Sequence, residues 1–246
     1  MENKIRVTVW NEFEDEQNWP EIMEMYAGGV HEYIAAFLRE DANTEVTTAT
    51  LHSPEQGLPD ELLDRTDVLI WYSHMSQDAV SPEKIRKIAS RVIEEGMGVI
   101  FVHSGFFSNL AGYLIGAHGS GAYREIKELE RVFVIDRSHP IAKGLPEYFE
   151  FPESEMYTEG MGTPTPDETV FLSWYAGGNA ARSGMCWKRG AGKIFYFSPG
   201  HAWYDVMLHE PFHTVIRNAV QWAAPSGRPC PVMTGRIEAL PVKNGQ

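Results

Sequence analysis

The feature that most constrains this chain is a regular alternation of short apolar runs with helical patterns through its first half. Near-continuous apolar runs are typical of strands that a parallel sheet buries on both faces. Such runs occupy residues 5–10 (IRVTVW), 45–51 (EVTTATL), 67–72 (DVLIWY) and 99–102 (VIFV). Helical patterns separate them at residues 31–40, 59–65 and 81–96. This order predicts an α/β fold with a doubly wound, mostly parallel sheet of flavodoxin-like type.

The second half of the chain has a different pattern, with short strands separated by tight turns. The predicted strands are residues 131–135, 169–175, 183–188 and 193–198. The glycine-containing turn at 189–192 favours a hairpin, so an antiparallel edge should complete the sheet. A final helix is expected at about 210–224. One domain should span residues 1–246, with a loop-like tail or subunit arm at 225–246, where prolines and glycines recur.

Charge and cysteine content exclude several classes of protein. The net charge of −13 and the pI near 5.1 argue against nucleic acid and anionic membrane surfaces as partners, because both require a positive surface. The two cysteines, Cys186 and Cys230, have no metal-type spacing, which favours a reducing compartment over a disulfide scaffold. The chain starts directly with a strand pattern and holds no membrane-length apolar run, so we expect a cytoplasmic protein.

Polar side chains, histidines above all, follow the predicted parallel strands. Ligands of open α/β sheets bind beyond the carboxyl ends of the strands, where such residues would meet. One further histidine, His31, begins the first predicted helix on the same side. Just beyond the strands lie Asn11, Glu12, Ser73, His74, His103, Ser104 and, after Ser198, Pro199 and Gly200, His201. The sequence therefore predicts a histidine-rich site at this rim of the sheet.

Neutral imidazole is both a common zinc ligand and the side chain best suited to proton transfer near neutral pH. Two interpretations of the rim therefore stay open, beside the simpler one that each histidine is a hydrogen-bonded polar residue at a strand end. A divalent metal, zinc in the first place, would take its ligands from the four rim histidines, His31, His74, His103 and His201. The candidate catalytic groups are His103, His201, Glu12 and Glu155, the last in the loop-like stretch PESEMYTEG.

Aromatic side chains are also frequent near the predicted rim. Trp203 and Tyr204 follow His201 in a loop and are candidates to stack on a sugar ring. Trp71 ends a buried strand, so it is either a substrate contact or part of the core. Asn11 and Ser104 complete the set of candidate substrate-binding residues.

The stretch His209-Glu210-Pro211-Phe212-His213 matches the zinc-protease pattern H-E-x-x-H. That motif requires both histidines one turn apart on a continuous helix, and proline is tolerated only where a helix starts. We therefore interpret the stretch as a helix N-terminus. Cys186, within a predicted β-ribbon and without a base beside it in sequence, is interpreted as a packing residue.

Several segments together resemble the trehalose-utilisation (ThuA-like) family, and the likeness covers nearly the whole chain. The segments are VTVWNE, YAGGVHEYIA, DVLIWYSHMSQDAVS, VIFVHSGFFSNL, HPIAKGLPEYFEFPESEMYTE, RSGMCWKRGAGKIFYFSPGH and IRNAVQWAAP. The resemblance implies a class I glutamine amidotransferase-like fold, in agreement with the doubly wound sheet. It also implies a role in the use of trehalose or related disaccharides, with keto-sugars as possible intermediates.

The resemblance to amidotransferases ends where their chemistry is decided. Their nucleophilic cysteine follows the central strand, where this chain has His103-Ser104-Gly105. Their F-H-P-E motif corresponds here to Phe197-Ser198-Pro199-Gly200-His201. A thioester mechanism is therefore excluded, and Ser104 could act as a nucleophile only beside a base.

Three functions remain as hypotheses from the sequence. The first is a metal-assisted enzyme that modifies a small-molecule sugar. The second is a sugar-binding or regulatory module without chemistry, and the third is a metal-free acid–base enzyme acting on a keto-sugar. Assembly into a homo-oligomer is a further expectation, based on the tail and the irregular second half.

Overall fold

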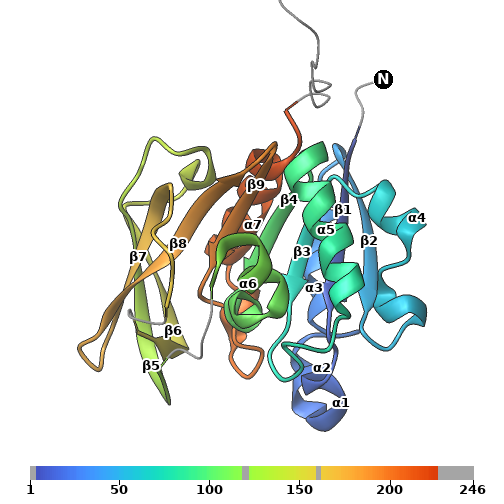
Figure 1. The fold of residues 1–246 in the computed structure, drawn as a ribbon. Helices are drawn as coiled ribbons and strands as arrows, with labels where there is room; N and C mark the ends of the chain where they lie inside the picture. The colour runs from blue at the N-terminus through green and yellow to red at the C-terminus, as the bar shows by residue number, and fades with distance from the viewer. Residues whose placement is uncertain (1–3, 118–121, 159–161, 227–246) are drawn as a thin grey trace, which may run out of the picture.

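The computed structural model describes residues 4–117, 122–158 and 162–226, which form one twisted, nine-stranded sheet with helices on both faces (Figure 1). The strand order is β2-β1-β3-β4-β9-β8-β7-β5-β6. Most of the predicted tail, residues 227–246, lies outside the described residues. The strands are β1 (Ile5–Asn11), β2 (Thr44–Thr50), β3 (Val68–Tyr72), β4 (Gly98–Val102), β5 (Tyr123–Val134), β6 (Tyr148–Tyr157), β7 (Glu168–Tyr175), β8 (Ala180–Arg189) and β9 (Gly192–Phe197).

The first half of the sheet has the predicted parallel arrangement. Strands β2, β1, β3, β4 and β9 pair in parallel, and every residue of β3 and β4 is buried. Alternate residues of β3 enter different cores: Ile70 and Tyr72 join one hydrophobic cluster, Leu69 and Trp71 the other. Continuous apolar sequences form these strands because helices cover both faces of the sheet.

Helices α3 (Val30–Leu38) and α7 (Glu210–Ala223) contribute to the first of these clusters, and α5 (Pro82–Glu95) and α6 (Asn109–Ile115) contribute to the second. The side chain of Ser81 caps the N-terminus of α5, and Gly96 ends that helix in the left-handed conformation. The shorter helices are α1 (Asp15–Asn18), α2 (Pro20–Met25) and α4 (Asp60–Asp64). Helices α1 and α2 were not predicted from the sequence.

The prediction of a mostly parallel sheet was too strong. Among the described strands, β9, β8, β7, β5 and β6 pair antiparallel in succession, so four of the eight pairings are antiparallel. The expected hairpin is present as β8–β9, but β5 is far longer than predicted and β6 occupies part of the stretch interpreted as a loop. Both strands carry many charged residues, because one face of an antiparallel sheet can be solvated, and this hides their strand pattern.

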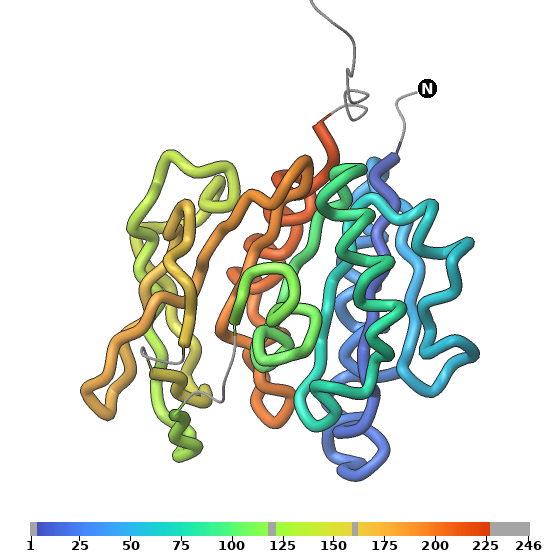
Figure 2. Tube along the Cα trace, in the orientation of Figure 1, coloured from blue at the N-terminus to red at the C-terminus, as the bar shows by residue number. Residues whose placement is uncertain are grey.

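The carboxyl ends of the parallel strands all reach one edge of the molecule. In Figure 2 the chain segments after β1 (blue), β3 (teal) and β9 (orange) turn at the same lower edge. Helices α1 and α2 lie there as well (Figure 1). The fold thus brings segments near residues 12, 74, 103 and 201 to one rim, as predicted. No helix of the described part of the chain is long and apolar enough to cross a bilayer.

Candidate functional site

Three side chains with metal-ligating atoms meet at this rim. The nearest ligand atoms of His103, Glu155 and His201 all lie within 4.8 Å of one another. His103 Nε2 is 2.9 Å and His201 Nε2 is 3.7 Å from Glu155 Oε2. The exposed fraction of each residue is 6% or less. The structure therefore brings together three of the predicted catalytic residues, two of which were also predicted metal ligands.

His103 occupies a sharp turn between β4 and the next helical segment. Its φ is +52°, in the left-handed region that non-glycine residues seldom adopt. Two residues later, Gly105 lies so close to β3 that a Cβ atom there would be 2.7 Å from the Trp71 carbonyl oxygen. Strained non-glycine positions of this kind are concentrated at functional sites. The backbone thus presents a buried histidine at a strained turn directly after β4.

The partners of His103 settle which of its nitrogens carries hydrogen. Nδ1 lies 2.8 Å from the Ser198 carbonyl oxygen, which can only accept, so Nδ1 is the donor. In the neutral ring Nε2 then has a lone pair, and Glu155 Oε2, only 2.9 Å away, is an acceptor too, so a proton or a cation has to lie between the two atoms. The same Nε2 is 3.0 Å from the Tyr157 hydroxyl, which can donate to it. His103 is therefore oriented as a base or a metal ligand.

His201 has the opposite arrangement. The backbone N–H of Trp203 donates to His201 Nδ1 at 3.1 Å, so in the neutral ring the hydrogen is on Nε2. Burial, together with the charges of His103 and His74, lowers the pKa of His201 to about 2. His201 is therefore neutral and directs an N–H group toward Glu155.

Glu155 comes from β6, where the ladder with β5 is irregular. The register shifts between the Glu128–Ser154 and Glu130–Phe151 pairs, and both Ser154 and Glu155 are buried. A bulge of this kind re-aims side chains, so neighbouring residues of a strand can both point inward. Glu155 Oε2 has no hydrogen-bond partner, although it is close to His103. A buried carboxylate oxygen in this state suits a cation or a proton.

The interior of the antiparallel half also holds Glu130, a fully buried carboxylate that was not predicted from the sequence. It accepts hydrogen bonds from Ser154 at 2.6 Å, from Ser173 at 2.5 Å and from Tyr175 at 3.0 Å. Burial raises the pKa of Glu130, and these hydroxyl groups partly offset the effect. Because Ser154 precedes Glu155, this network helps to fix the bulge that carries Glu155.

His74 joins the cluster through ring contacts and belongs to a separate ion pair. Its ring centroid is 4.9 Å from that of His201, and its Nδ1 lies 3.0 Å and 3.1 Å from the two carboxylate oxygens of Asp15. Burial alone would lower the pKa of His74, but the hydrogen bond and charge of Asp15 outweigh it and raise the pKa. The structure gives His74 a carboxylate partner that we did not predict.

The other predicted residues near the first strand lie beside the cluster and outside its ligand set. Glu12 is buried and accepts the backbone N–H groups of Met75 and Ser76, at 2.5 Å and 2.8 Å. Burial raises the pKa of Glu12 against the effect of these N–H groups. His31 Nδ1 is 3.2 Å from Asn11 Nδ2, and burial lowers the pKa of His31. Glu12 thus holds the loop after β3 in place, while His31 and Asn11 contact each other beside it.

The candidate substrate contacts divide into two sets. Trp203 and Ser104 line a cavity beside the cluster. Trp71 is 1% exposed and stacked on Trp10, Tyr204 is 4% exposed, and Asn11 is fully buried, so these three belong to the core. The Ser104 hydroxyl donates to the Ser73 carbonyl at 2.9 Å, an arrangement that does not activate it as a nucleophile.

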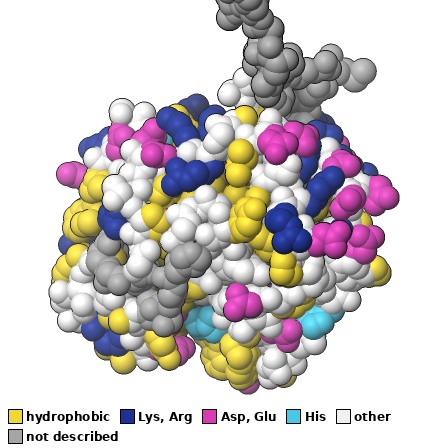
Figure 3. All heavy atoms as spheres, in the orientation of Figure 1, with side chains coloured by type: hydrophobic (Ala, Val, Ile, Leu, Met, Phe, Trp, Pro, Cys, Tyr) yellow, Lys and Arg dark blue, Asp and Glu magenta, His cyan; other side chains and the backbone are white. Residues whose placement is uncertain are grey.

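The cavity measures about 560 Å³, which is typical of small-molecule sites. Glu155, Tyr157, His74 and His201 form its inner part together with Ser104, while Trp19, Trp203, Met75, Tyr123 and Glu125 also line it. No lysine or arginine lines it among the residues that the structure describes. Figure 3 shows histidine, apolar and acidic side chains side by side along the lower edge of the face that it draws.

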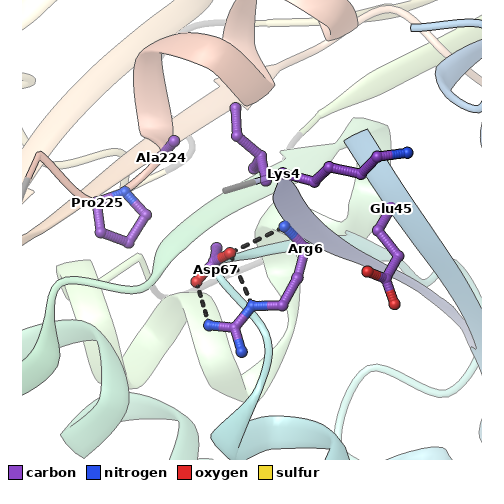
Figure 4. Close-up of a pocket in the computed structure, with 7 residues that line it drawn as sticks. Lys4, Arg6, Glu45, Asp67, Ala224 and Pro225 are labelled. Carbon is purple, nitrogen blue, oxygen red and sulfur yellow. Dashed lines mark hydrogen bonds and ion pairs between the residues drawn. The ribbon is translucent and has the colours of Figure 1, made fainter. Parts of the chain in front are cut away.

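A second pocket, of about 540 Å³, lies at the opposite, amino ends of the strands (Figure 4). Arg6 and Asp67 dominate it, and the Arg6 guanidinium is bound to both carboxylate oxygens of Asp67. Their charges satisfy each other. This pocket has no histidine in its lining, whereas His74 and His201 line the rim cavity.

The interpretations of the remaining motifs agree with the structure. His209 precedes α7, which starts at Glu210 with Pro211 in its first turn, and His213 Nε2 is bound to the Met207 carbonyl at 2.8 Å. The two histidines thus have separate partners. Cys186 is buried, and burial raises the pKa of its thiol well above the usual range, as expected of a packing residue. The structure nevertheless places a base beside it that was not expected, since His139 Nε2 lies 3.9 Å from its Sγ.

Comparison with known proteins agrees with this architecture. The chain has the fold of three solved structures that are each below 20% identical to it. A ThuA-like protein from Bacteroides uniformis is 17% identical, with a TM-score of 0.65 over 93% of this chain and 96% of that one. A cytoplasmic protein from Salmonella typhimurium is 12% identical, with a TM-score of 0.61 over 89% and 99%. A protein from Thermoplasma acidophilum described as a GMP synthase component is 13% identical, with a TM-score of 0.55 over 90% and 94%.

The fold and the rim site define an α/β protein with a buried histidine–carboxylate cluster at the carboxyl ends of its parallel strands. The family model for ThuA, trehalose utilisation, matches residues 6–223. The chain therefore belongs to the ThuA family. No protein with a curated description matches it.

Proposed function

We propose that this chain is an enzyme of carbohydrate metabolism that acts on a sugar carbonyl, assisted by a divalent metal, zinc, bound by His103, Glu155 and His201. The observation that carries the proposal is the meeting of their ligand atoms within 4.8 Å, buried beside a cavity of small-molecule size. Two histidines and one carboxylate form a known catalytic zinc set that leaves a position open. The family description, trehalose utilisation, supports a sugar as the substrate.

The donor groups fit a metal to different degrees. Glu155 Oε2 is buried without a hydrogen-bond partner. The Nδ1–H of His103 donates to the Ser198 carbonyl, and metal-ligating histidines commonly make such a bond with the nitrogen that does not bind the metal. His201 fits less well, because the Trp203 N–H holds hydrogen on its Nε2. Metal binding at His201 Nε2 would require its hydrogen to move to Nδ1, which breaks the hydrogen bond from Trp203. This change of tautomer releases no net proton, so His201 itself adds no pH dependence to zinc uptake.

The residues of the chain would divide the work as follows. A bound metal would polarise the sugar carbonyl and lower the pKa of a bound water. His74, whose pKa is raised by the hydrogen bond and charge of Asp15, would serve as a proton donor at the edge of the cavity. Glu12 accepts the N–H groups of the loop after β3 and so fixes the position of His74.

One observation favours a second candidate, a metal-free acid–base enzyme acting on a keto-sugar. His103 Nε2 is oriented as a base, and His201 Nε2–H is oriented as a donor, so the two could remove a proton beside a carbonyl and stabilise the enolate oxygen. The lowered pKa of His201 keeps it neutral and hence a constant donor.

The decisive experiment is zinc titration of protein purified without a metal-affinity tag, with metal content measured before and after chelation. His103→Asn should weaken zinc binding at least tenfold. The matched control is His139→Asn, because His139 Nε2 also lies 2.9 Å from a glutamate, Glu168, in a distant part of the sheet. Equal affinity in both variants, or the absence of stoichiometric zinc from the wild-type protein, would refute the metal proposal.

The two candidates differ in how a chelator affects turnover. Exchange of the proton next to the carbonyl of a keto-disaccharide can be followed in D₂O by NMR. The metal-dependent enzyme should lose exchange after chelation and regain it with zinc. The metal-free enzyme should keep it and lose it in His103→Asn. Saturable sugar binding without any exchange would favour a binding module over both.

We also propose that the protein acts in the cytoplasm, as the description of the Salmonella protein of the same fold supports. Assembly into a homo-oligomer remains a prediction. Light scattering on the purified full-length chain tests it.

A further inference from the structure

Two tryptophans form an apolar corner at the mouth of the rim cavity. Trp19 lies between α1 and α2, and Trp203 lies far away in sequence, two residues after His201. Their ring centroids are 4.9 Å apart at an interplanar angle of 59°. Both line the same cavity, so their exposed surfaces face the space next to the histidine–carboxylate cluster. Packing of the two rings against each other gives the corner a defined shape.

The corner is only partly buried, so its aromatic surface is accessible to a ligand. Trp203 is 39% exposed, and two other lining residues, Met75 and Tyr123, are 55% and 65% exposed. Apolar side chains gathered around a cavity mouth commonly mark a binding surface. Aromatic rings are especially suited to sugars, because they offer a flat apolar face to a ring whose own faces carry C–H groups.

The charges around the cavity restrict what can bind there. Two carboxylates, Glu125 and Glu155, line it, and within the described part of the chain no lysine or arginine does. The one cationic candidate, His74, is already paired with Asp15. A bound metal would neutralise Glu155, but no lysine or arginine of the described lining compensates Glu125, so a phosphorylated or acidic sugar would still meet the negative charge of that carboxylate.

The backbone connects this corner to the reacting groups. The N–H of Trp203 is the donor that fixes the ring of His201, while the indole of the same residue forms the corner. The position of a ligand ring held by the indole is therefore tied to that of the His201 ring through the hydrogen bond between the Trp203 N–H and His201 Nδ1. The cavity, about 560 Å³, has room for more than one sugar ring.

We propose that Trp19 and Trp203 form an outer subsite that binds the second ring of an uncharged glycoside while the first ring faces the cluster. The proposal rests on the proposed function, since it assumes a sugar substrate at that cluster. It adds that the substrate has at least two rings, carries no phosphate or carboxylate, and depends on two tryptophans for affinity.

The test is calorimetric binding of three probes to the full-length protein: trehalose, glucose and trehalose 6-phosphate. Trp203→Ala and Trp19→Ala should each weaken trehalose binding roughly fivefold to tenfold, with little change for glucose. Trehalose 6-phosphate should bind the wild-type protein at least tenfold more weakly than trehalose. Trp174→Ala is the matched control, because Trp174 is 38% exposed on β7, away from the cavity.

Trp203→Leu keeps an apolar side chain and guards against misfolding, and it should weaken trehalose binding like Trp203→Ala. Unchanged trehalose affinity in the Trp19 and Trp203 variants overturns the proposal, as does equal affinity for the phosphorylated sugar or no saccharide binding by the wild-type protein. Zinc titration of the same variants separates this result from the proposed function. Zinc affinity should stay within twofold of wild type, whatever happens to the disaccharide.

Discussion

Replacing His201 with asparagine should make the metal-free protein less sensitive to mild acid. In the folded chain the pKa of His201 is lowered to about 2, first by burial and then by the charges of His103 and His74. In the unfolded chain its pKa returns to about 6.5. Protons therefore bind the unfolded chain in preference as the pH falls below that value, and each such proton favours unfolding.

Because the pKa of His201 is lower in the folded state, its contribution to stability is complete above pH 6.5 and is lost as the pH falls toward 2. At pH 5 the loss is about 1.5 pH units times 1.36 kcal/mol, or about 2 kcal/mol. Screening by solvent is small, since His201 is only 3% exposed.

Other histidines contribute equally to both proteins. The lowered pKa of His31 adds to acid sensitivity. The raised pKa of His74 has the opposite effect, because its contribution grows as the pH falls through the folded pKa. Comparing the variant with the wild-type protein therefore isolates the contribution of His201.

The assay is urea unfolding at pH 7.5 and pH 5.0, with a chelator present in all samples. His201→Asn suits the test, because the asparagine side-chain oxygen can still accept the Trp203 N–H that binds His201 Nδ1. Between the two pH values the wild-type protein should lose about 2 kcal/mol more free energy of unfolding than the variant. The control is His52→Asn, because the side chain of His52 is 45% exposed and so is not buried like that of His201. This variant should behave like the wild-type protein. If the wild-type and His201→Asn proteins lose the same free energy, His201 takes up a proton in the folded state and the reasoning fails.

Three further predictions follow from single contacts. Gly105→Ala should destabilise the chain by about 2 kcal/mol or more in urea unfolding, because the new Cβ would lie 2.7 Å from a carbonyl oxygen of β3; a smaller effect would mean that the turn yields easily. Asp15→Asn should lower the pKa of His74 in an NMR titration, because it removes the charge that raises it, and an unchanged pKa would contradict the pairing. Glu130→Leu should cost about 2 to 4 kcal/mol by leaving three buried hydroxyl groups without their acceptor, whereas Glu130→Gln should cost much less.

The parallel half of the fold could be predicted because its signals are local. Strands such as β3 and β4 are buried on both faces, so their apolar character is continuous in sequence. The rim of the site follows from the same fact, since polar residues directly after such strands must meet at one edge. His74, His103 and His201 were identified in this way.

The antiparallel half and its contribution to the site were less predictable. β5 and β6 have charged and exposed positions along much of their length, so neither shows a strand pattern in sequence. Glu130 lies within such a charged stretch and is nevertheless fully buried, because hydroxyl groups from β6 and β7 surround it. Asp15, which begins the short helix α1, and Trp19, which lies between α1 and α2, escaped notice because the position of these helices depends on tertiary packing. An acid-rich run directly after the first strand was the only available signal.

The division of roles between His103 and His201 shows what sequence cannot decide. Both are buried histidines that follow parallel strands, and in sequence they are equivalent. Each has its Nδ1 bound to one backbone group, a carbonyl for His103 and an N–H for His201. That single difference places the ring hydrogen on opposite nitrogens, so Nε2 is a lone pair in one ring and a donor in the other. The chemistry of the cluster is thus set by the backbone at Ser198 and Trp203, where the identity of the side chain is immaterial to the bond.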